Sequence, residues 1–282
     1  MTEVLSLHSG TVFKHAFSKP NIFREFVRDI TGVEINPKQI HTEYEYNEPV
    51  GNVKIKYDIF AEDDKERVVV EIQHIKEEDF FARFLYYHMI GIIEQVAKHD
   101  AYEPPKRVFT IVVLASVPRD GSITFSWGRH LMEILDEHNK RHEIAPHELI
   151  FLNPRLVNES TPDSTKPWLE LIKDSFDKQM DKGDYESPTF KDLIDSINKQ
   201  RMTDAVSAGI KDETAWEMAS QRFHEEGVEE GVEIGMEEGI EKGRRQQQEE
   251  TARIMLEKDV ELSIIIAATG LTVEEIEALH HN

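Results

Sequence analysis

Two acidic side chains early in the chain have the types and spacing that could hold a metal ion. Asp58 lies in an alternating apolar segment at residues 54–61, and Glu71 lies in a second such segment at 67–74. Alternation of this kind predicts two β-strands. In the first strand it places one set of side chains on each face: Ile55, Tyr57 and Ile59 on one, and Lys56, Asp58 and Phe60 on the other.

The acidic segment between these strands predicts a turn at residues 63–66. In the resulting hairpin Glu62 faces Arg67, and counting inward places Asp58 opposite Glu71. Directly opposed side chains have Cβ atoms roughly 4.5–5.5 Å apart, so two like charges there destabilise the sheet. A divalent cation between them would remove the repulsion, and hard cations such as Mg²⁺ take carboxylate oxygens.

A half-exposed hairpin also carries polar side chains on its solvent face, which is the simpler interpretation of the same pattern. Two features favour a site. Asp is depleted in strand interiors, yet Asp58 stands in the middle of one, and Lys56 and Gln73 share its face. Acids, a base and an amide together suit phosphoryl chemistry.

Composition limits the classes of protein that this chain can belong to. Its 282 residues suffice for one large or two modest domains. The formal net charge of −22 argues against a protein that coats nucleic acid electrostatically. Residues 1–110 hold 14 basic and 19 acidic side chains, so most of the negative charge lies further on. The sequence has no long apolar run typical of a membrane span, no signal-peptide pattern and no cysteine, which favours a cytoplasmic protein.

Periodicity and turn residues predict an α/β core over residues 1–155, with helices packed on a sheet. Helices are expected at 11–17, 21–30, 78–98 and 130–138, and further strands at 42–46, 107–116, 122–127 and 147–152. The 78–98 helix has a broad apolar stripe that we expect to be buried: Phe80, Phe81, Phe84, Leu85, Met89, Ile92, Ile93 and Val96.

This order of elements resembles the PD-(D/E)xK nuclease family transposases, also called recombination-promoting nucleases. The similarity covers roughly the first 155 residues and the character of the tail. A phenylalanine-lysine motif, a strand aspartate, a Glu-x-Gln element and a helical arginine-tyrosine-glutamine motif carry it. Their counterparts here are Phe13-Lys14 with Phe17, Asp58, Glu71-Ile72-Gln73, and Arg83 with Tyr86, Tyr87 and Gln95.

The resemblance implies a restriction-endonuclease-like mixed sheet with flanking helices, and metal-dependent hydrolysis of DNA. Asp58 and Glu71 would hold Mg²⁺, with Mn²⁺ as an alternative. Gln73 would orient a water by hydrogen bonding, because an amide cannot take a proton at neutral pH. The substrate-binding residues would be Lys14, Lys56, Arg83 and Tyr86.

Two positions depart from the family pattern. Gly10 stands where an acidic residue is expected, and Gln73 stands where the wider motif has lysine. With the global acidity, Gly10 favours the alternative of a catalytically inactive interaction protein that keeps the nuclease fold. RNA as the substrate uses the same site and stays open beside DNA.

The tail is expected to be all-helical, with no membrane segment. We divide it into a helical linker region at 156–211, a Glu/Gly-repeat helix at 212–250 and a small helical module at 251–282. Glycine recurs every fourth residue from Gly227 to Gly243, which would let a second helix approach closely, so we expect a homo-oligomer. A flexible acidic linker is the alternative. Thr272 and Glu275 predict a capping box for the last helix.

Overall fold

The structure is a computed structural model of the chain. It describes all residues except 47–54, 74–79, 97–103, 118–120, 122 and 281–282. The chain divides into two compact units, residues 1–213 and 214–282. Among the described helices, none combines the length and the apolar character needed to cross a lipid bilayer.

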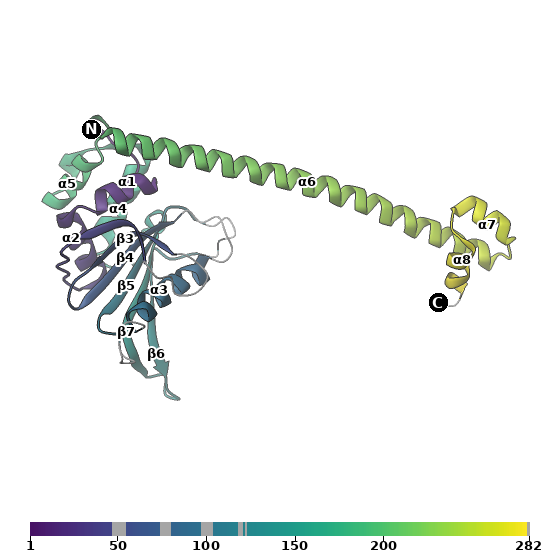
Figure 1. The fold of residues 1–282 in the computed structure, drawn as a ribbon, viewed down its shortest axis with the longest axis horizontal. Coiled ribbons are helices and arrows are strands. Elements are labelled where there is room, and N and C mark those ends of the chain that lie inside the picture. The colour runs from purple at the N-terminus through teal and green to yellow at the C-terminus, as the bar shows by residue number, and fades with distance from the viewer. Residues whose placement is uncertain (47–54, 74–79, 97–103, 118–120, 122, 281–282) are drawn as a thin grey trace. The chain divides into compact units, whose positions relative to one another are not determined.

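A mixed β-sheet forms the centre of the first unit (Figure 1). In the described part of the chain it has six strands in the order β2-β3-β4-β5-β7-β6. The β4–β5 and β5–β7 pairs are parallel, and the other neighbours are antiparallel. The strands are β2 (Ile40–Glu45), β3 (Lys56–Glu62), β4 (Glu66–Gln73), β5 (Arg107–Leu114), β6 (Trp127–Leu135) and β7 (Arg141–Leu152).

The two central strands, β4 and β5, are buried along most of their length because helices cover both sides of the sheet. The hairpin of β3 and β4 has the predicted turn, and Glu62 pairs with Arg67 as expected. The predicted strand at 107–116 is confirmed as β5. This is the α/β, restriction-endonuclease-like arrangement expected from the sequence, with a mixed sheet between helices.

Four helices contribute to the core on one face of the sheet. They are α1 (Gly10–Phe17), α2 (Pro20–Thr31), α4 (Lys166–Asp174) and α5 (Pro188–Ser196). Trp168 of α4 is fully buried among aromatic side chains of α1, α2 and α5, and its indole Nε1 donates to Asp29 Oδ2 at 2.9 Å. The segment that follows residue 155 therefore packs into the same core as α1 and α2. Strands β1 (Thr2–Glu3) and β8 (Gln179–Met180) pair beside it.

Helix α3 (Phe80–Val96) covers the opposite face. Phe84, Ile90 and Ile92 are buried. The expectation of one broad buried stripe is wrong in part, because the helix rests on the sheet along one side only. A row at four-residue spacing remains more than a third exposed: Phe81, Leu85, Met89 and Ile93.

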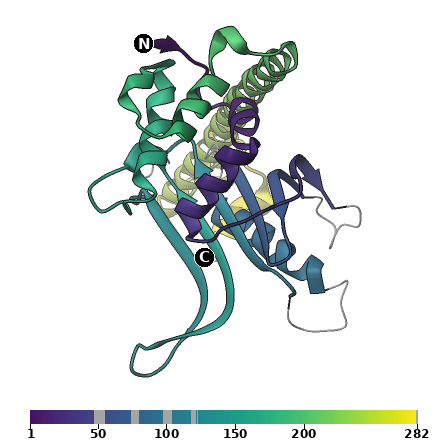
Figure 2. The ribbon, with the colours of Figure 1, turned by 90° about the vertical axis from the view of Figure 1, so that its left-hand side faces the viewer.

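The predicted helix at 130–138 is wrong. Residues 130–135 belong to β6, which pairs with the long strand β7, and residues 136–138 lie in the turn of this hairpin. Figure 2 shows the curved β6–β7 hairpin. The turn is closed by the Asp136 backbone N–H, which donates to the Lys140 carbonyl, with Asn139 in a left-handed conformation. The strand expected at 122–127 is also absent from its described residues, and Trp127 opens β6.

Helix α6 (Asp204–Glu257) runs without a break through the predicted Glu/Gly-repeat segment. Helices α7 (Leu262–Thr269) and α8 (Val273–His280) complete the second unit around a small apolar cluster. The predicted capping box is confirmed: the Thr272 N–H donates to Glu275 Oε2 at 2.8 Å, and the Glu275 N–H donates to Thr272 Oγ1 at 3.3 Å.

Candidate active site

The two candidate carboxylates lie where β3 and β4 separate. Backbone pairing between these strands ends with Ile59 and Val70, one step before Asp58 and Glu71. Beyond it, side chains replace the backbone ladder. The Asp58 N–H donates to Glu71 Oε1 at 3.2 Å, and the Ile72 N–H donates to Asp58 Oδ2 at 3.0 Å. The carboxylates thus close the gap between the strands and lie beside each other.

A break in the β2–β3 ladder directs Asp58 into this gap. Thr42 pairs with Ile59 and Tyr44 with Tyr57, but Glu43 and Asp58 between them do not pair. Glu43 has a φ of 56°, in the left-handed region.

The faces of β3 change at this break, which corrects the strict alternation expected from the sequence. Ile59 packs in the core with α1 and α2. Ile55 and Tyr57 instead join Phe60 in the cluster on the α3 side. Three side chains expected on one face are therefore divided between two, because an irregular residue in a neighbouring strand resets the alternation.

The pair is poorly solvated. Glu71 is 4% exposed, and the side chain of Asp58 is 21% exposed. Burial raises the pKa of Glu71 well above its ordinary value, and the Asp58 carboxylate raises it further. Burial also raises the pKa of Asp58, although Lys14 and the Ile72 N–H oppose the shift. Two carboxyl groups that resist ionising together are an electrostatic setting that a cation would relieve.

Lys14 supplies a positive charge beside this pair. It projects from α1, and its Nζ lies 3.4 Å from Asp58 Oδ1. The same ammonium pairs with Glu43. Burial disfavours the charged lysine, but the Asp58 and Glu43 carboxylates outweigh it and raise the pKa of Lys14. Lys14 is therefore held protonated beside the carboxylates, where it could contact a phosphate.

The residues present fit a hard divalent cation. Asp58 and Glu71 supply only oxygen donors, and their mutual repulsion disfavours the metal-free, doubly ionised pair. The described residues contain no group of three or more His, Asp or Glu side chains arranged to hold a metal ion. The candidate site therefore offers two protein carboxylates. Two carboxylates suit Mg²⁺, which keeps several waters and commonly takes substrate phosphate oxygens as further ligands.

The remaining predicted site residues lie around the pair in different ways. Lys56 Nζ bonds Glu43 Oε2 at 2.5 Å. Arg83 is exposed on α3, its guanidinium packs on the Tyr87 ring, and its charge partly offsets the raised pKa of Glu71. Tyr86 is half-buried beside the α3-side cluster. Gln73 ends β4, two residues after Glu71, and its side chain is half-buried.

Gln95, part of the helical motif that carries the resemblance, has a structural role here. It is 3% exposed, its amide Nε2 donates to the Gly91 carbonyl at 3.2 Å, and its Oε1 accepts from the Lys106 N–H at 3.2 Å. Lys106 immediately precedes β5, so Gln95 fixes α3 to the beginning of that strand. Strands β4 and β5 run parallel, and Glu71 lies near the end of β4. Gln95 and Glu71 are therefore at opposite ends of these two strands.

Sequence reasoning missed two acidic residues near the site. Glu43 pairs with both nearby lysines. Glu213 accepts from the Gly10 N–H at 2.7 Å and from Ser9 Oγ at 2.6 Å, and so caps α1. The Glu213 carboxylate therefore lies beside Gly10, the position where the family pattern has an acidic residue. The contact joins residues 203 positions apart, and no local pattern in the sequence indicates it.

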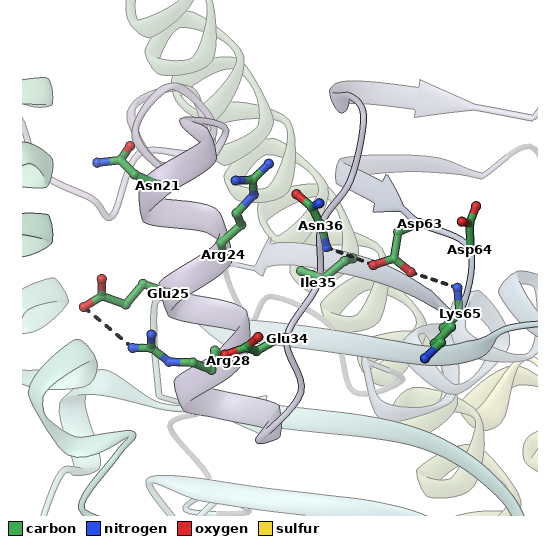
Figure 3. Close-up of a pocket in the computed structure, with 10 residues that line it drawn as sticks. All are labelled: Asn21, Arg24, Glu25, Arg28, Glu34, Ile35, Asn36, Asp63, Asp64 and Lys65. Carbon is green, nitrogen blue, oxygen red and sulfur yellow. Dashed lines mark hydrogen bonds and ion pairs between the residues drawn. The ribbon is translucent and has the colours of Figure 1, made fainter.

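A pocket of about 710 Å³ lies elsewhere, between α2 and the β3–β4 turn (Figure 3). Its lining has charges of both signs. Asp63 in its wall already accepts from the backbone N–H groups of Asn36 and Lys65, each at 2.9 Å. Neither Asp58 nor Glu71 lines it. The two candidate carboxylates therefore lie outside this pocket, in the gap between β3 and β4.

Comparison with known proteins identifies a family for most of the chain. A family model described as PD-(D/E)XK nuclease family transposase matches residues 20–218. The matched range contains both carboxylates and begins just after α1. No curated protein and no solved structure matches the chain.

Proposed function

The chain belongs to the PD-(D/E)XK nuclease family transposases, and from that premise we propose that it is a metal-dependent DNA endonuclease acting in recombination or on mobile elements. Membership gives a nuclease- or transposase-related function with nucleic acid as the substrate. The metal, the hydrolytic activity, the choice of DNA and a cytoplasmic location are part of the proposal. The observation that carries it is the buried Asp58–Glu71 pair.

In this proposal Asp58 and Glu71 hold the cation, which is Mg²⁺ or Mn²⁺. When bound, such a cation supplies an activated water and neutralises charge that builds on the phosphate. The chain's own contribution is to fix both carboxylates through backbone N–H donors, so that little reorganisation accompanies binding.

The surrounding residues position the substrate. Lys14 remains charged and contacts a phosphate oxygen, and Lys56 and Arg83 add positive charge at the edge of the site. Tyr86 contacts the substrate beside them. Gln73 orients the attacking water through its amide and takes no proton from it.

The proposal predicts that the purified protein nicks plasmid DNA in Mg²⁺ and not in EDTA. Asp58→Asn should lose the activity, because it removes one of two charged ligands and leaves the side chain's shape unchanged. Conversion of supercoiled to open-circular plasmid measures the result.

Asp64→Asn is the matched control, since it removes one acidic charge from the exposed turn of the same hairpin. It should cleave like the wild type. Equal cleavage by Asp58→Asn and the wild type would contradict the assignment of this site. A wild type that binds Mg²⁺ in calorimetry but cuts neither DNA nor RNA would instead favour the inactive interaction protein.

We further propose that α6 mediates homo-oligomerisation. Five glycines in its repeat segment lower the helix propensity of α6. A Cβ added at Gly227, Gly231, Gly235, Gly239 or Gly243 would meet nothing within 4 Å beyond the adjacent backbone of its own helix. Each glycine costs about 0.5–1 kcal/mol of helix stability relative to alanine. Beside them stands an exposed apolar row that a second copy would cover: Val228, Val232, Met236 and Ile240.

Self-association predicts a concentration-dependent mass in sedimentation equilibrium. The double substitution Gly231→Gln, Gly235→Gln should shift the protein toward the monomer. A Cβ at either position has open space around it, and the longer side chains would block the close approach of a partner helix. The control Glu229→Gln, Glu233→Gln removes like charges and should associate at least as strongly. A monomeric wild type at every concentration would end this proposal.

A further inference from the structure

Glu43 holds both lysines that flank the candidate site. Its Oε1 pairs with Lys14 Nζ, and its Oε2 lies 2.5 Å from Lys56 Nζ. The two lysines come from different elements, α1 and β3, and converge on one carboxylate of β2. Lys14 also reaches Asp58 Oδ1 at 3.4 Å, so this carboxylate lies one side chain away from the candidate metal ligands.

The backbone at Glu43 is strained. Its φ of 56° is a conformation that a side chain with a Cβ rarely adopts, and glutamate has no special tendency toward it. Such positions persist only where the surrounding structure enforces them, and they concentrate at functional sites. The same residue interrupts the β2–β3 ladder opposite Asp58. The strain thus places the Glu43 carboxylate over the two lysines.

The position is accessible from solvent. The Glu43 side chain is 41% exposed and that of Lys56 is 51% exposed. Lys14 is 21% exposed and pairs with the same carboxylate, so a group that displaces Glu43 could reach both lysines. A carboxylate between two ammonium groups presents its two oxygens as the non-bridging oxygens of a phosphodiester would. Lysine pairs with phosphate as readily as with carboxylate.

We propose that Glu43 is a positioning residue that occupies the place of a DNA phosphate and gives up Lys14 and Lys56 when the backbone binds. This rests on the proposed function, because it names how the substrate enters that same site. In the free protein, Glu43 neutralises the two lysines and keeps them preoriented. When DNA binds, its phosphate pairs with Lys14 and Lys56 in place of Glu43, and the released Glu43 carboxylate turns to solvent.

The ion pairs of Glu43 should therefore weaken DNA binding. Each partly exposed ion pair that must break costs about 0.2–1 kcal/mol, so removing Glu43 should tighten binding about two- to thirtyfold for two pairs. The salt dependence should also steepen. In the wild type the freed Glu43 carboxylate reduces the net number of counterions released on binding. Glu43→Gln has no such carboxylate, so its net release is larger.

The test is binding of a fluorescein-labelled 20-base-pair duplex to the full-length protein in EDTA, measured by anisotropy from low to moderate salt. Glu43→Gln should bind more tightly, with a steeper slope of log K against log salt. Glu43→Gly should do the same, and because glycine accepts the left-handed backbone it guards against a folding defect. The control Glu3→Gln frees Lys199 from a similar 2.5 Å ion pair away from the site and should leave both quantities unchanged.

Affinity that is unchanged or weaker in both folded variants overturns the inference, whatever the cleavage assay gives. Calorimetry with Mg²⁺ alone excludes the rival role: weaker Mg²⁺ binding by Glu43→Gln, without tighter DNA binding, would make Glu43 a metal ligand. Because no step requires cleavage, tighter DNA binding by the variants supports the inference even if the wild type proves inactive.

Discussion

Replacing Glu71 by glutamine is expected to abolish metal-dependent cleavage and, in the same molecule, to stabilise the metal-free protein. Loss of a charged ligand removes several kcal/mol of transition-state stabilisation, which corresponds to a rate loss of about 10³-fold or more. The stability gain has a separate cause. Glutamine keeps an oxygen for the Asp58 N–H, and its amide can donate to the Asp58 carboxylate in place of the repulsion between two acids.

The gain should be on the order of 1–3 kcal/mol, the range for satisfying a buried polar group. It should depend on pH. Because the pKa of Glu71 is raised in the folded state, the unfolded chain loses this proton first as pH rises. The contribution of Glu71 to the free energy of unfolding of the wild type is therefore fully present below the ordinary glutamate pKa. It is lost as pH rises through the folded-state pKa.

Urea unfolding in EDTA from pH 4 to pH 8 measures this effect. The wild type should lose stability across the range above the ordinary glutamate pKa, and Glu71→Gln should show a flatter profile. Saturating Mg²⁺ should restore the wild type at high pH and have little effect on the variant. Asp64→Asn in the exposed turn should follow the wild type. A Glu71→Gln protein that is less stable than the wild type at pH 8 would contradict the buried like-charge pair.

Replacing Arg67 by methionine is expected to destabilise the first unit more than any surface change. Arg67 is 7% exposed, and its guanidinium donates to Glu94 Oε2 and Gly91 O, at 2.8 and 3.0 Å. It also pairs with Glu62 at 2.8 Å. Glu94 is 3% exposed, so the substitution leaves its carboxylate buried without this counter-charge. Breaking a buried pair in this way costs about 3–5 kcal/mol.

For a unit of this size that loss corresponds to a fall in Tm of roughly 6–20 °C. Differential scanning calorimetry would measure it. The double variant Arg67→Met, Glu94→Gln should recover part of the loss, because it removes the uncompensated charge while keeping the shape of the side chain. Glu94→Gln alone should cost less than Arg67→Met. If the double variant is no more stable than Arg67→Met, packing and not charge explains the effect.

Local patterns predicted much of the first unit. Alternation and the acidic turn predicted the β3–β4 hairpin and the Glu62–Arg67 pair, because side-chain period and turn chemistry are properties of neighbouring residues. Capping residues predicted the beginning of α8 for the same reason. The apolar run of β5 indicated a strand covered on both faces, as the structure has it.

What could not be predicted depends on distant residues. The left-handed Glu43 shifts the faces of β3, and no local rule indicates a glutamate in that conformation. The segment at 130–138 has helical spacing, but residues 130–135 pair with β7 and form a strand. The cap on α1 comes from Glu213. In each case a contact made by the folded chain overrides the preference of the segment.

The Glu213 cap also has a consequence for synthesis on the ribosome. Gly10 in α1 is synthesised 203 residues before Glu213, so the N–H groups of Gly10 and Thr11 must wait for their acceptor. Trp168, around which the aromatic side chains of α1, α2 and α5 gather, also emerges late. A nascent chain released early would therefore carry Asp58 and Glu71 without the finished scaffold that aligns Lys14. Truncated products that lack Glu213 should therefore be cleaved faster by added protease than the full chain.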